Sequence, residues 1–271
     1  MPTDSQPPDA MNDTPREDTP RADVALLVAD VSQRLQVTSA SIKAAISSLL
    51  DNSIIWDRSA QREFMQTIDE SIDQVSGVMA AMSLAMQSES GVLRFSPEPS
   101  SIPEILFRVA DGLQKDTPGV AVELALPGEG KPALVDYDYL RIALKMLLEA
   151  LIAAGGPSSG RAAPHRGRPA GSPPLVLRIR AEQTAAHWQI HVSGEFAAAA
   201  GEMVAWLAAA PDHLLPPANG INPETRLKAF AAAHLLRQQR IRLMADESSG
   251  PAAFTLEIPY KGERWTSAGS Y

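Results

Sequence analysis

The chain has 271 residues, a formal charge of −8 and 45% hydrophobic residues, enough to bury the core of one large or two small domains. The acidic balance argues against a nucleic-acid partner, because a surface that follows phosphates needs an excess of Lys and Arg. With no cysteine, no apolar run of about 18 residues and no basic-apolar leader, the sequence excludes disulfides and thiolate metal sites and predicts a cytoplasmic protein that does not associate with a membrane.

The first segment, residues 1–22, is rich in Pro, Asp and Thr and has almost no large apolar side chain. Such a segment cannot offset the entropy lost on ordering by burying apolar surface. We therefore expect a disordered tail.

Residues 23–95 are predicted to form an antiparallel helical hairpin, because two stretches with apolar residues three and four apart flank a short connection. Asp57 or Ser59 is the predicted N-cap of the second helix. The seam between the helices is expected to contain Val24, Val28, Val31, Leu35, Thr38, Ile42, Ala45 and Leu49 from the first helix, and Phe64, Ile68, Ser71, Val75, Val78, Met82 and Ala85 from the second.

Five more apolar side chains lie beside this seam, where one hairpin alone leaves them exposed: Ile46, Met65, Ile72, Met79 and Met86. Pairing two hairpins into a dimeric four-helix bundle would cover them. The periodicity alone leaves open a helical stalk that packs within one chain.

Residues 96–262 are predicted to form an α/β sandwich with helices on one face of a sheet. Helices are expected at about 102–114, 138–153, 198–209 and 225–239, and strands at 175–181, 188–192 and 254–258. The Gly/Pro/Arg-rich stretch 155–174 is expected to be a flexible loop, and 263–271 a tail.

Several stretches carry a resemblance to a known family. Residues 31–35 (VSQRL) and 40–49 (ASIKAAISSL) resemble the dimerisation and phosphotransfer helix of sensor histidine kinases, closest to the potassium-sensing ones. Residues 90–94 (SGVLR) are similar to the family's exit from the bundle, and 135–141 (VDYDYLR) to the strand and helix start before its ATP-binding N box. The resemblance implies an α+β protein, a dimeric four-helix bundle followed by a histidine-kinase-type ATPase sandwich.

The hairpin departs from that family where phosphoryl transfer takes place. The phosphoacceptor histidine falls at Gln33, whose amide is not a usable nucleophile, and its acidic neighbour falls at Arg34. The polar residue used for phosphatase activity falls at Val37, and the helix-kinking proline at Thr38. All five histidines lie after residue 164. The resemblance therefore leaves the hairpin without a catalytic residue.

The ATP-binding motifs are altered as well. The magnesium-binding asparagine of the N box falls at Glu149 and an earlier polar position at Lys145, which lie four residues apart and are placed to form an ion pair. The adenine-reading aspartate falls near Ser193, in an alignment that can slip by one residue. The glycine-rich phosphate loop falls on residues 224–229, which include Arg226 and Lys228 and contain no glycine. We expect no bound cofactor, with ATP and Mg²⁺ only if this degenerate site still binds them.

Two groups of residues, a histidine pair on a predicted strand and a basic stretch after the N-box helix, could bind a ligand, but we favour a purely structural interpretation of both. His187 and His191 share one face of a predicted strand but have no further ligands for a metal, so we expect no metal site. The basic residues Arg161, His165, Arg166 and Arg168 follow the N-box helix and suit either a solvated loop or an anion-binding one, and we favour the solvated loop.

The sequence thus favours a non-catalytic signalling protein, a dimeric regulator or adaptor of a two-component system. Its expected partners are a second copy, a histidine kinase in a heterodimer, or the receiver domain of a response regulator. The alternative is a divergent but active histidine kinase or phosphotransferase. A third, weaker option uses Gln33 to position a hydrolytic water on a partner's acyl phosphate.

Overall fold

The computed structural model describes residues 19–51, 57–128, 130–155, 174–196, 198–209, 221–246 and 253–260, and every structural statement below concerns these ranges. Residues 1–18 of the expected tail, residues 156–173 of the expected loop and the tail 263–271 lie outside them.

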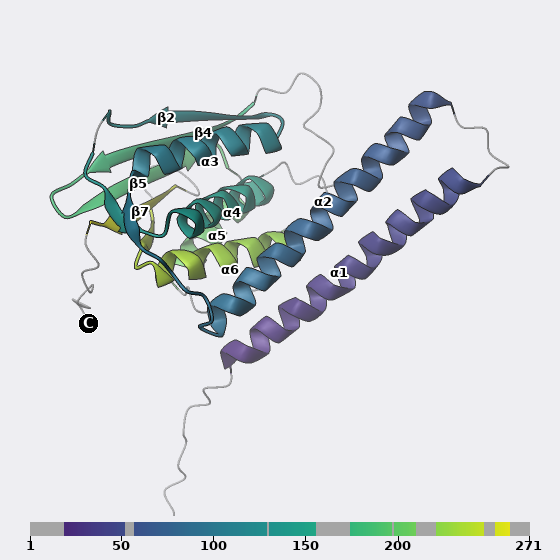
Figure 1. Cartoon of the computed structure of the whole chain (residues 1–271), viewed down its shortest axis with the longest axis horizontal. Coiled ribbons are helices and arrows are strands. Elements are labelled where there is room, and N and C mark those ends of the chain that lie inside the picture. Colours follow the sequence, from purple (N-terminus) through teal and green to yellow (C-terminus); the bar gives the residue numbers. More distant parts are fainter. Residues whose placement is uncertain are drawn as a thin grey trace, which may run out of the picture.

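The chain begins with two long helices, α1 (Thr19–Leu50) and α2 (Arg58–Glu89), each of 32 residues. They run antiparallel as a hairpin that projects from the rest of the molecule (Figure 1). The prediction of a hairpin is confirmed. Its start is corrected, because α1 begins at Thr19, inside the segment 1–22 that we assigned to a disordered tail.

The predicted seam faces the hairpin interior. Among the described side chains, Val31, Val78 and Ala85 are buried, and the other seam positions are half-buried. The residues between them on the outer faces are mostly exposed. A spacing of three and four residues places side chains on one stripe of a helix, which is why the seam was readable from the sequence.

Local chemistry fixes the ends of α2. Its N-cap is Asp57, whose Oδ1 accepts a hydrogen bond from the Ala60 backbone N–H at 2.7 Å. That bond, with a second from the Ser59 hydroxyl, lowers the pKa of Asp57. At the other end Gly91 has φ of +67°, which a residue without a Cβ adopts freely, and the backbone turns out of the helix there.

The described part of the chain after the hairpin contains these strands: β1 (Glu98–Ser100), β2 (Val120–Ala125), β3 (Ala133–Val135), β4 (Leu175–Gln183), β5 (His187–Gly194), β6 (Arg242–Ala245) and β7 (Phe254–Pro259). β1 and β3 pair antiparallel as a small ribbon. The main sheet has five strands in the order β2-β4-β5-β7-β6, with β2 parallel to β4 and the other pairs antiparallel.

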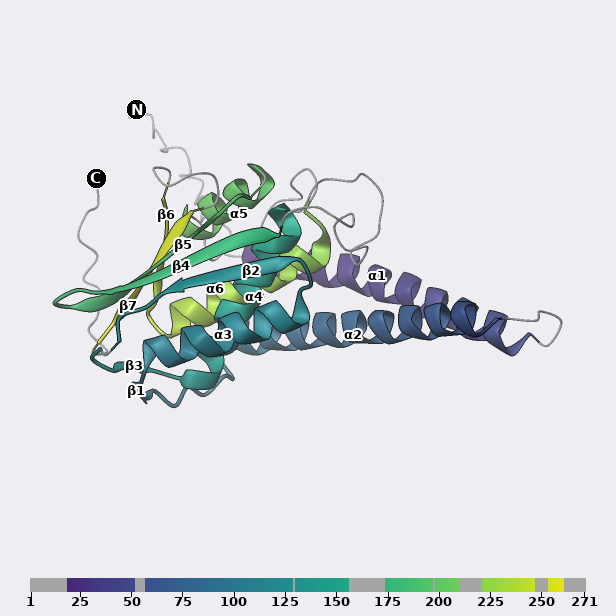
Figure 2. The same ribbon diagram turned by 90° about the horizontal axis from the view of Figure 1, so that it is seen from above.

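Four helices complete the sandwich: α3 (Ile102–Asp116), α4 (Tyr137–Gly155), α5 (Ala198–Ala209) and α6 (Pro223–Gln238). Figures 1 and 2 show α3, α4 and α6 on one face of the sheet. The core lies between this layer and the inward side chains of the strands, among them Leu177, Trp188 and Leu256, which are fully buried. The predicted sandwich is confirmed.

The short strands β1 and β6 and the edge strand β2 were not among the predicted elements, and the strand expected before the N-box helix is β3. Strands of three or four residues are too short to show an alternating pattern. They form because a neighbouring strand supplies hydrogen bonds, which is a tertiary contact.

Candidate functional site

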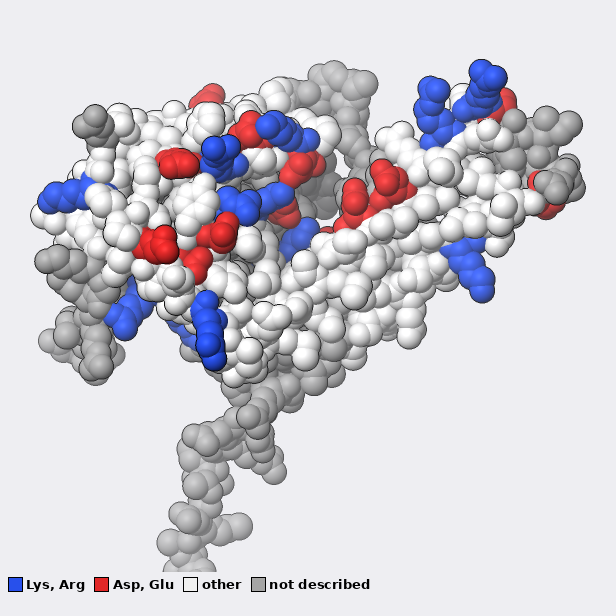
Figure 3. Space-filling model, viewed as in Figure 1, with Lys and Arg blue, Asp and Glu red and all other residues white. Residues whose placement is uncertain are grey.

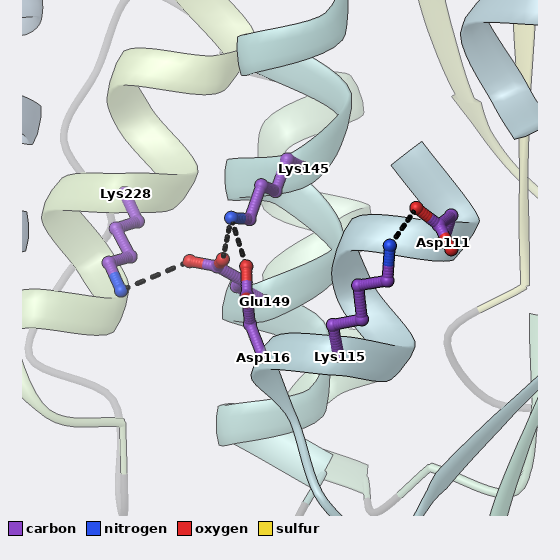
Figure 4. Close-up of polar contacts among 6 residues, drawn as sticks. All are labelled: Asp111, Lys115, Asp116, Lys145, Glu149 and Lys228. Carbon is purple, nitrogen blue, oxygen red and sulfur yellow. Dashed lines mark hydrogen bonds and ion pairs between the residues drawn. The ribbon is translucent and has the colours of Figure 1, made fainter. Parts of the chain in front are cut away.

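Four charged side chains meet where α4 packs along α6. On α4, Lys145 and Glu149 lie one turn apart, with Lys145 Nζ 3.7 Å from Glu149 Oε1. On α6, Lys228 Nζ lies 3.2 Å from Glu149 Oε2 and 3.3 Å from Glu224 Oε1. Both carboxylate oxygens of Glu149 therefore face an ammonium group (Figure 4).

A third helix joins this cluster. Asp116, the last residue of α3, lies 2.5 Å from Lys145 Nζ through its Oδ2. Figure 4 shows Lys145 pointing between Glu149 and Asp116. We call these five residues the charged cluster: Asp116, Lys145, Glu149, Glu224 and Lys228. Sequence reasoning placed Lys145, Glu149 and Lys228 here, and missed Asp116, which lies 29 residues before Lys145 in the chain.

The ionisation of Lys228 reflects the cluster. Burial of its side chain disfavours the charged form and by itself lowers the pKa. The carboxylates of Glu149 and Glu224 outweigh that effect, so the pKa of Lys228 lies above the ordinary value of 10.5. The ammonium group is thus held charged at neutral pH by two carboxylates.

A backbone N–H in the first turn of α6 is capped by the side chain of the residue that precedes the helix. Asn222 is its N-cap, and the Asn222 side-chain oxygen accepts a hydrogen bond from the Thr225 backbone N–H at 2.8 Å. Pro223 occupies the first turn, where a residue without an N–H is tolerated. Arg226, one of the predicted site positions, is buried, with 8% of its surface exposed.

Phe196 fills the space between the end of α4 and the end of β5. Its side chain is only 6% exposed. A Cβ added at Gly155 would lie 2.9 Å from the ring Cδ1, and one added at Gly194 would lie 2.8 Å from Cε2. The two glycines therefore leave room for the ring, and the ring occupies that room.

Ser193 does not join the charged cluster. Along β5 the buried residues alternate, with Trp188, Ile190 and Val192 facing the helices. Ser193 follows Val192 and pairs with Arg178 of β4, whose exposed side chain lies on the opposite face. The structure therefore places Ser193 on the face of the sheet away from α4 and α6. The alternation of apolar and polar residues along β5 in the sequence already indicated that face.

His187 and His191 share this outer face, as predicted. His191 Nδ1 lies 2.9 Å from the Thr255 hydroxyl, and His187 Nε2 lies 3.6 Å from the Glu257 carboxylate. Over the described ranges, no group of three or more His, Asp or Glu side chains is arranged to hold a metal ion.

On the hairpin, Gln33 is exposed beside the buried Val31, so this position points away from the seam. Val37, one turn further along, is 62% exposed. The backbone places Arg34 between them in α1, but its side chain is not among those described. Gln33 therefore lies on the outside of the hairpin, as the heptad spacing predicted, and Val37 is exposed as well.

The apolar side chains predicted beside the seam are exposed: Ile46 by 41%, Met65 by 61%, Ile72 by 49%, Met79 by 60% and Met86 by 50%. On the face seen in Figure 3, few of the described side chains along the middle of the hairpin are charged, and more charged groups lie near its loop end and on the sandwich. A single chain therefore leaves a large part of its hairpin apolar and open to solvent.

A hydrogen-bonded joint that sequence reasoning missed connects the hairpin to the sandwich. The Gln238 amide, at the end of α6, donates to the Ser88 carbonyl oxygen at 2.7 Å and to its hydroxyl at 2.8 Å. Next to it, Gln239 Oε1 accepts from the Asp136 backbone N–H, and Asp136 Oδ2 accepts from the Ser96 N–H. The C-terminal end of α6 is thereby bonded to the end of α2 and, through Asp136, to the segment that follows it.

Within the described ranges, no helix combines the length and the apolar character needed to cross a membrane.

The sequence matches no protein-family model and no curated protein. Among solved structures, the fold is similar to the histidine kinase AdeS of Acinetobacter baumannii, with a TM-score of 0.57 and 14% identity over 84% of this chain and 98% of that one. A histidine kinase from Burkholderia phymatum STM815 also matches, with a TM-score of 0.39 and 15% identity over 92% of this chain and 100% of that one. The likeness to AdeS shows the fold, a helical hairpin followed by an α/β sandwich, as in the dimerisation and ATPase regions of histidine kinases.

Proposed function

We propose that this chain, whose fold is shared with a histidine kinase, is a two-component signalling protein that works without phosphoryl transfer, as a dimeric regulator or adaptor. The potassium-sensing kinases are the subgroup that its hairpin sequence resembles most closely. The charged cluster between α4 and α6 is the observation that carries the proposal.

The cluster does not fit a magnesium nucleotide. A carboxylate is a suitable ligand for Mg²⁺ when its oxygens are free to coordinate. Both oxygens of Glu149 face lysine ammonium groups instead, at 3.7 Å and 3.2 Å. A hydrogen bond to a charged ligand is worth about 1.5–3 kcal/mol. Losing two such bonds to the magnesium nucleotide would weaken nucleotide binding by roughly 10² to 10⁴.

The rest of the region supports the same conclusion. The first turn of α6 is capped by Asn222, and no glycine there lets a phosphate approach the backbone. Phe196 fills the space between Gly155 and Gly194, at the ends of α4 and β5. Ser193, aligned with the adenine-reading aspartate, lies on the other face of the sheet.

The hairpin lacks a phosphoacceptor in the expected place. Gln33 is exposed on the outer face of α1, where a reactive side chain would be accessible. Its amide has no lone pair with the nucleophilicity of a neutral imidazole. Since all five histidines lie after residue 164, no other histidine of the hairpin can replace it.

The exposed apolar flank supports assembly. Five large apolar side chains on one projecting hairpin are unusual for a monomer and are covered when two hairpins pack as a four-helix bundle. We take a second copy of the chain as the first partner. A histidine kinase in a heterodimer and the receiver domain of a response regulator are the other partners to test.

The test of this function is incubation of the purified full chain with radiolabelled ATP and Mg²⁺, with calorimetry of Mg-ATP binding in parallel. We expect no labelled protein and no heat of binding at millimolar nucleotide. An acid-labile phosphoprotein would overturn the proposal in favour of the alternative, a divergent active histidine kinase or phosphotransferase. A chain that is monomeric and ignores every receiver domain and kinase offered to it would exclude the regulator or adaptor role.

A further inference from the structure

The outer face of α2 carries a regular row of apolar side chains, three of them thioethers. Met65, Ile72, Met79 and Met86 follow each other at intervals of seven residues and are 49–61% exposed. Seven residues fall about 20° short of two full helical turns, so the four side chains lie almost in line along the helix. We call these four residues the methionine stripe.

The described parts of the chain leave this stripe uncovered. The buried residues of α2 lie on other faces: Val78, Ala81, Ala85 and Ser88 are at most 5% exposed, and Ser88 contacts Gln238 of α6. The stripe thus remains open to solvent with the sandwich already in contact with the hairpin. Another molecule is needed to bury it.

Charge complementarity favours a second copy as that molecule. Lys43 is exposed three residues before Ile46 on α1, and Asp69 is exposed three residues before Ile72 on α2. The connection between the helices is centred at residue 54, so Lys43 lies level with Met65, each eleven residues away. A copy related by a two-fold axis along the hairpin brings Lys43 of one chain within about one helical turn of Asp69 of the other.

The methionine stripe is reactive toward peroxide because the chain offers no cysteine to react in its place. With no cysteine present, the thioethers are the side chains that peroxide oxidises most readily. Met146 and Met203 are buried, with 9% and 0% of their surface exposed, while the three methionines of the stripe are the most exposed of those described. Oxidation would therefore begin on the surface that assembles.

We infer that the methionine stripe is an oxidation-sensitive dimer surface, an inference that rests on the proposed function. Hydrogen peroxide transfers one oxygen atom to each sulfur: the O–O bond breaks, an S–O bond forms, the sulfur is oxidised by two electrons, and water leaves. The sulfoxide is polar where the thioether was apolar, and burying it in the dimer costs free energy. Peroxide therefore dissociates the dimer, and a methionine sulfoxide reductase, by reducing the sulfoxides, allows the dimer to form again.

The experiment measures dimer dissociation by analytical ultracentrifugation of the full chain before and after graded hydrogen peroxide, with peptide mass mapping of each methionine. We expect oxidation at Met65, Met79 and Met86 to raise the dissociation constant by roughly tenfold or more. Treatment with methionine sulfoxide reductases should return it to the starting value.

The matched control is the triple variant Met65→Leu, Met79→Leu and Met86→Leu, which keeps the volume and apolar character of the stripe. It should form the dimer and keep it in peroxide. An unchanged dissociation constant after full oxidation of the three methionines, or an equal loss in the triple variant, overturns the inference alone. An untreated chain that is monomeric at all concentrations overturns both the inference and the dimer of the proposed function.

Discussion

At the scale of single residues, Lys228 is the less exposed of the two lysines in the charged cluster. Its ammonium group lies between two carboxylates, Glu149 and Glu224, and its side chain is 21% exposed. Lys115 offers a contrast on the neighbouring helix α3. It forms an ion pair with Asp111 at 2.7 Å, but its side chain is 70% exposed. Exposed pairs of that kind contribute little to stability, because solvent screens them.

We therefore predict that Lys228→Met lowers the free energy of unfolding by about 1 kcal/mol, because Glu224 loses the ammonium group at 3.3 Å and Glu149 keeps only Lys145. Lys115→Met should change it by less than about half of that. In a double-mutant cycle with Glu149→Gln, the two substitutions should be less than additive. Denaturant unfolding of the four proteins measures this, and full additivity would show that the contact contributes nothing.

The same residue sets a dependence on pH. A lysine whose pKa is raised in the folded state adds stability that is fully present below the unfolded value and is lost as pH rises through the folded value. The contribution of Lys228 should accordingly be constant from neutral pH to about 10 and fall only above the ordinary value of 10.5. A difference between wild type and Lys228→Met that changes between pH 6 and 9 would contradict this assignment.

At the scale of elements, Phe196 and the two glycines decide how α4 meets β5. The ring fits because neither Gly155 nor Gly194 carries a Cβ. Gly112, in α3, is a natural comparison, because a Cβ added there would meet nothing within 4 Å.

We predict that Phe196→Ala costs roughly 3 kcal/mol through the cavity that it leaves. Gly194→Ala should also destabilise the wild type, since its Cβ would lie 2.8 Å from the ring and 3.0 Å from the Val176 carbonyl oxygen. In the Phe196→Ala background the ring contact disappears, so the added cost of Gly194→Ala should shrink. Gly112→Ala should be neutral or stabilising by up to about 1 kcal/mol, because alanine favours the helix. Equal costs of Gly194→Ala in both backgrounds would refute the role of the ring.

At the scale of the whole molecule, the joint at the end of α6 determines whether the hairpin and the sandwich move together. The Gln238 amide binds two oxygens of Ser88, a residue that is 3% exposed and lies 150 positions earlier in the chain. The opposite end of α6 carries Lys228 of the charged cluster. One helix therefore connects the charged cluster to the hairpin.

We predict that Gln238→Leu loosens this joint and costs about 1 kcal/mol, because the buried oxygens of Ser88 lose a donor. Amide hydrogen exchange should then increase in residues 78–89 of α2 and stay unchanged near the loop end of the hairpin. Gln61→Leu, an exposed glutamine at that loop end, serves as the control. Exchange that is the same in Gln238→Leu and wild type would show that apolar packing alone holds the two parts together.

The sequence by itself determined the local features of this protein. Spacings of three and four residues set the hairpin and its exposed apolar flank, the Asp57 cap set the start of α2, and the i,i+4 pair of Lys145 and Glu149 set the beginning of the charged cluster. Each of these depends on residues within a few turns of one another, where the geometry of a helix already fixes which side chains meet.

The tertiary structure decided what depends on distant partners. Asp116 and Lys228 reach Lys145 and Glu149 from other helices, and Gln238 reaches Ser88 across 150 positions. The short strands and the edge strand β2 exist through pairing with their neighbours, β2 in parallel with β4. Such contacts form only when packing of the core brings separate elements together, so no local pattern encodes them.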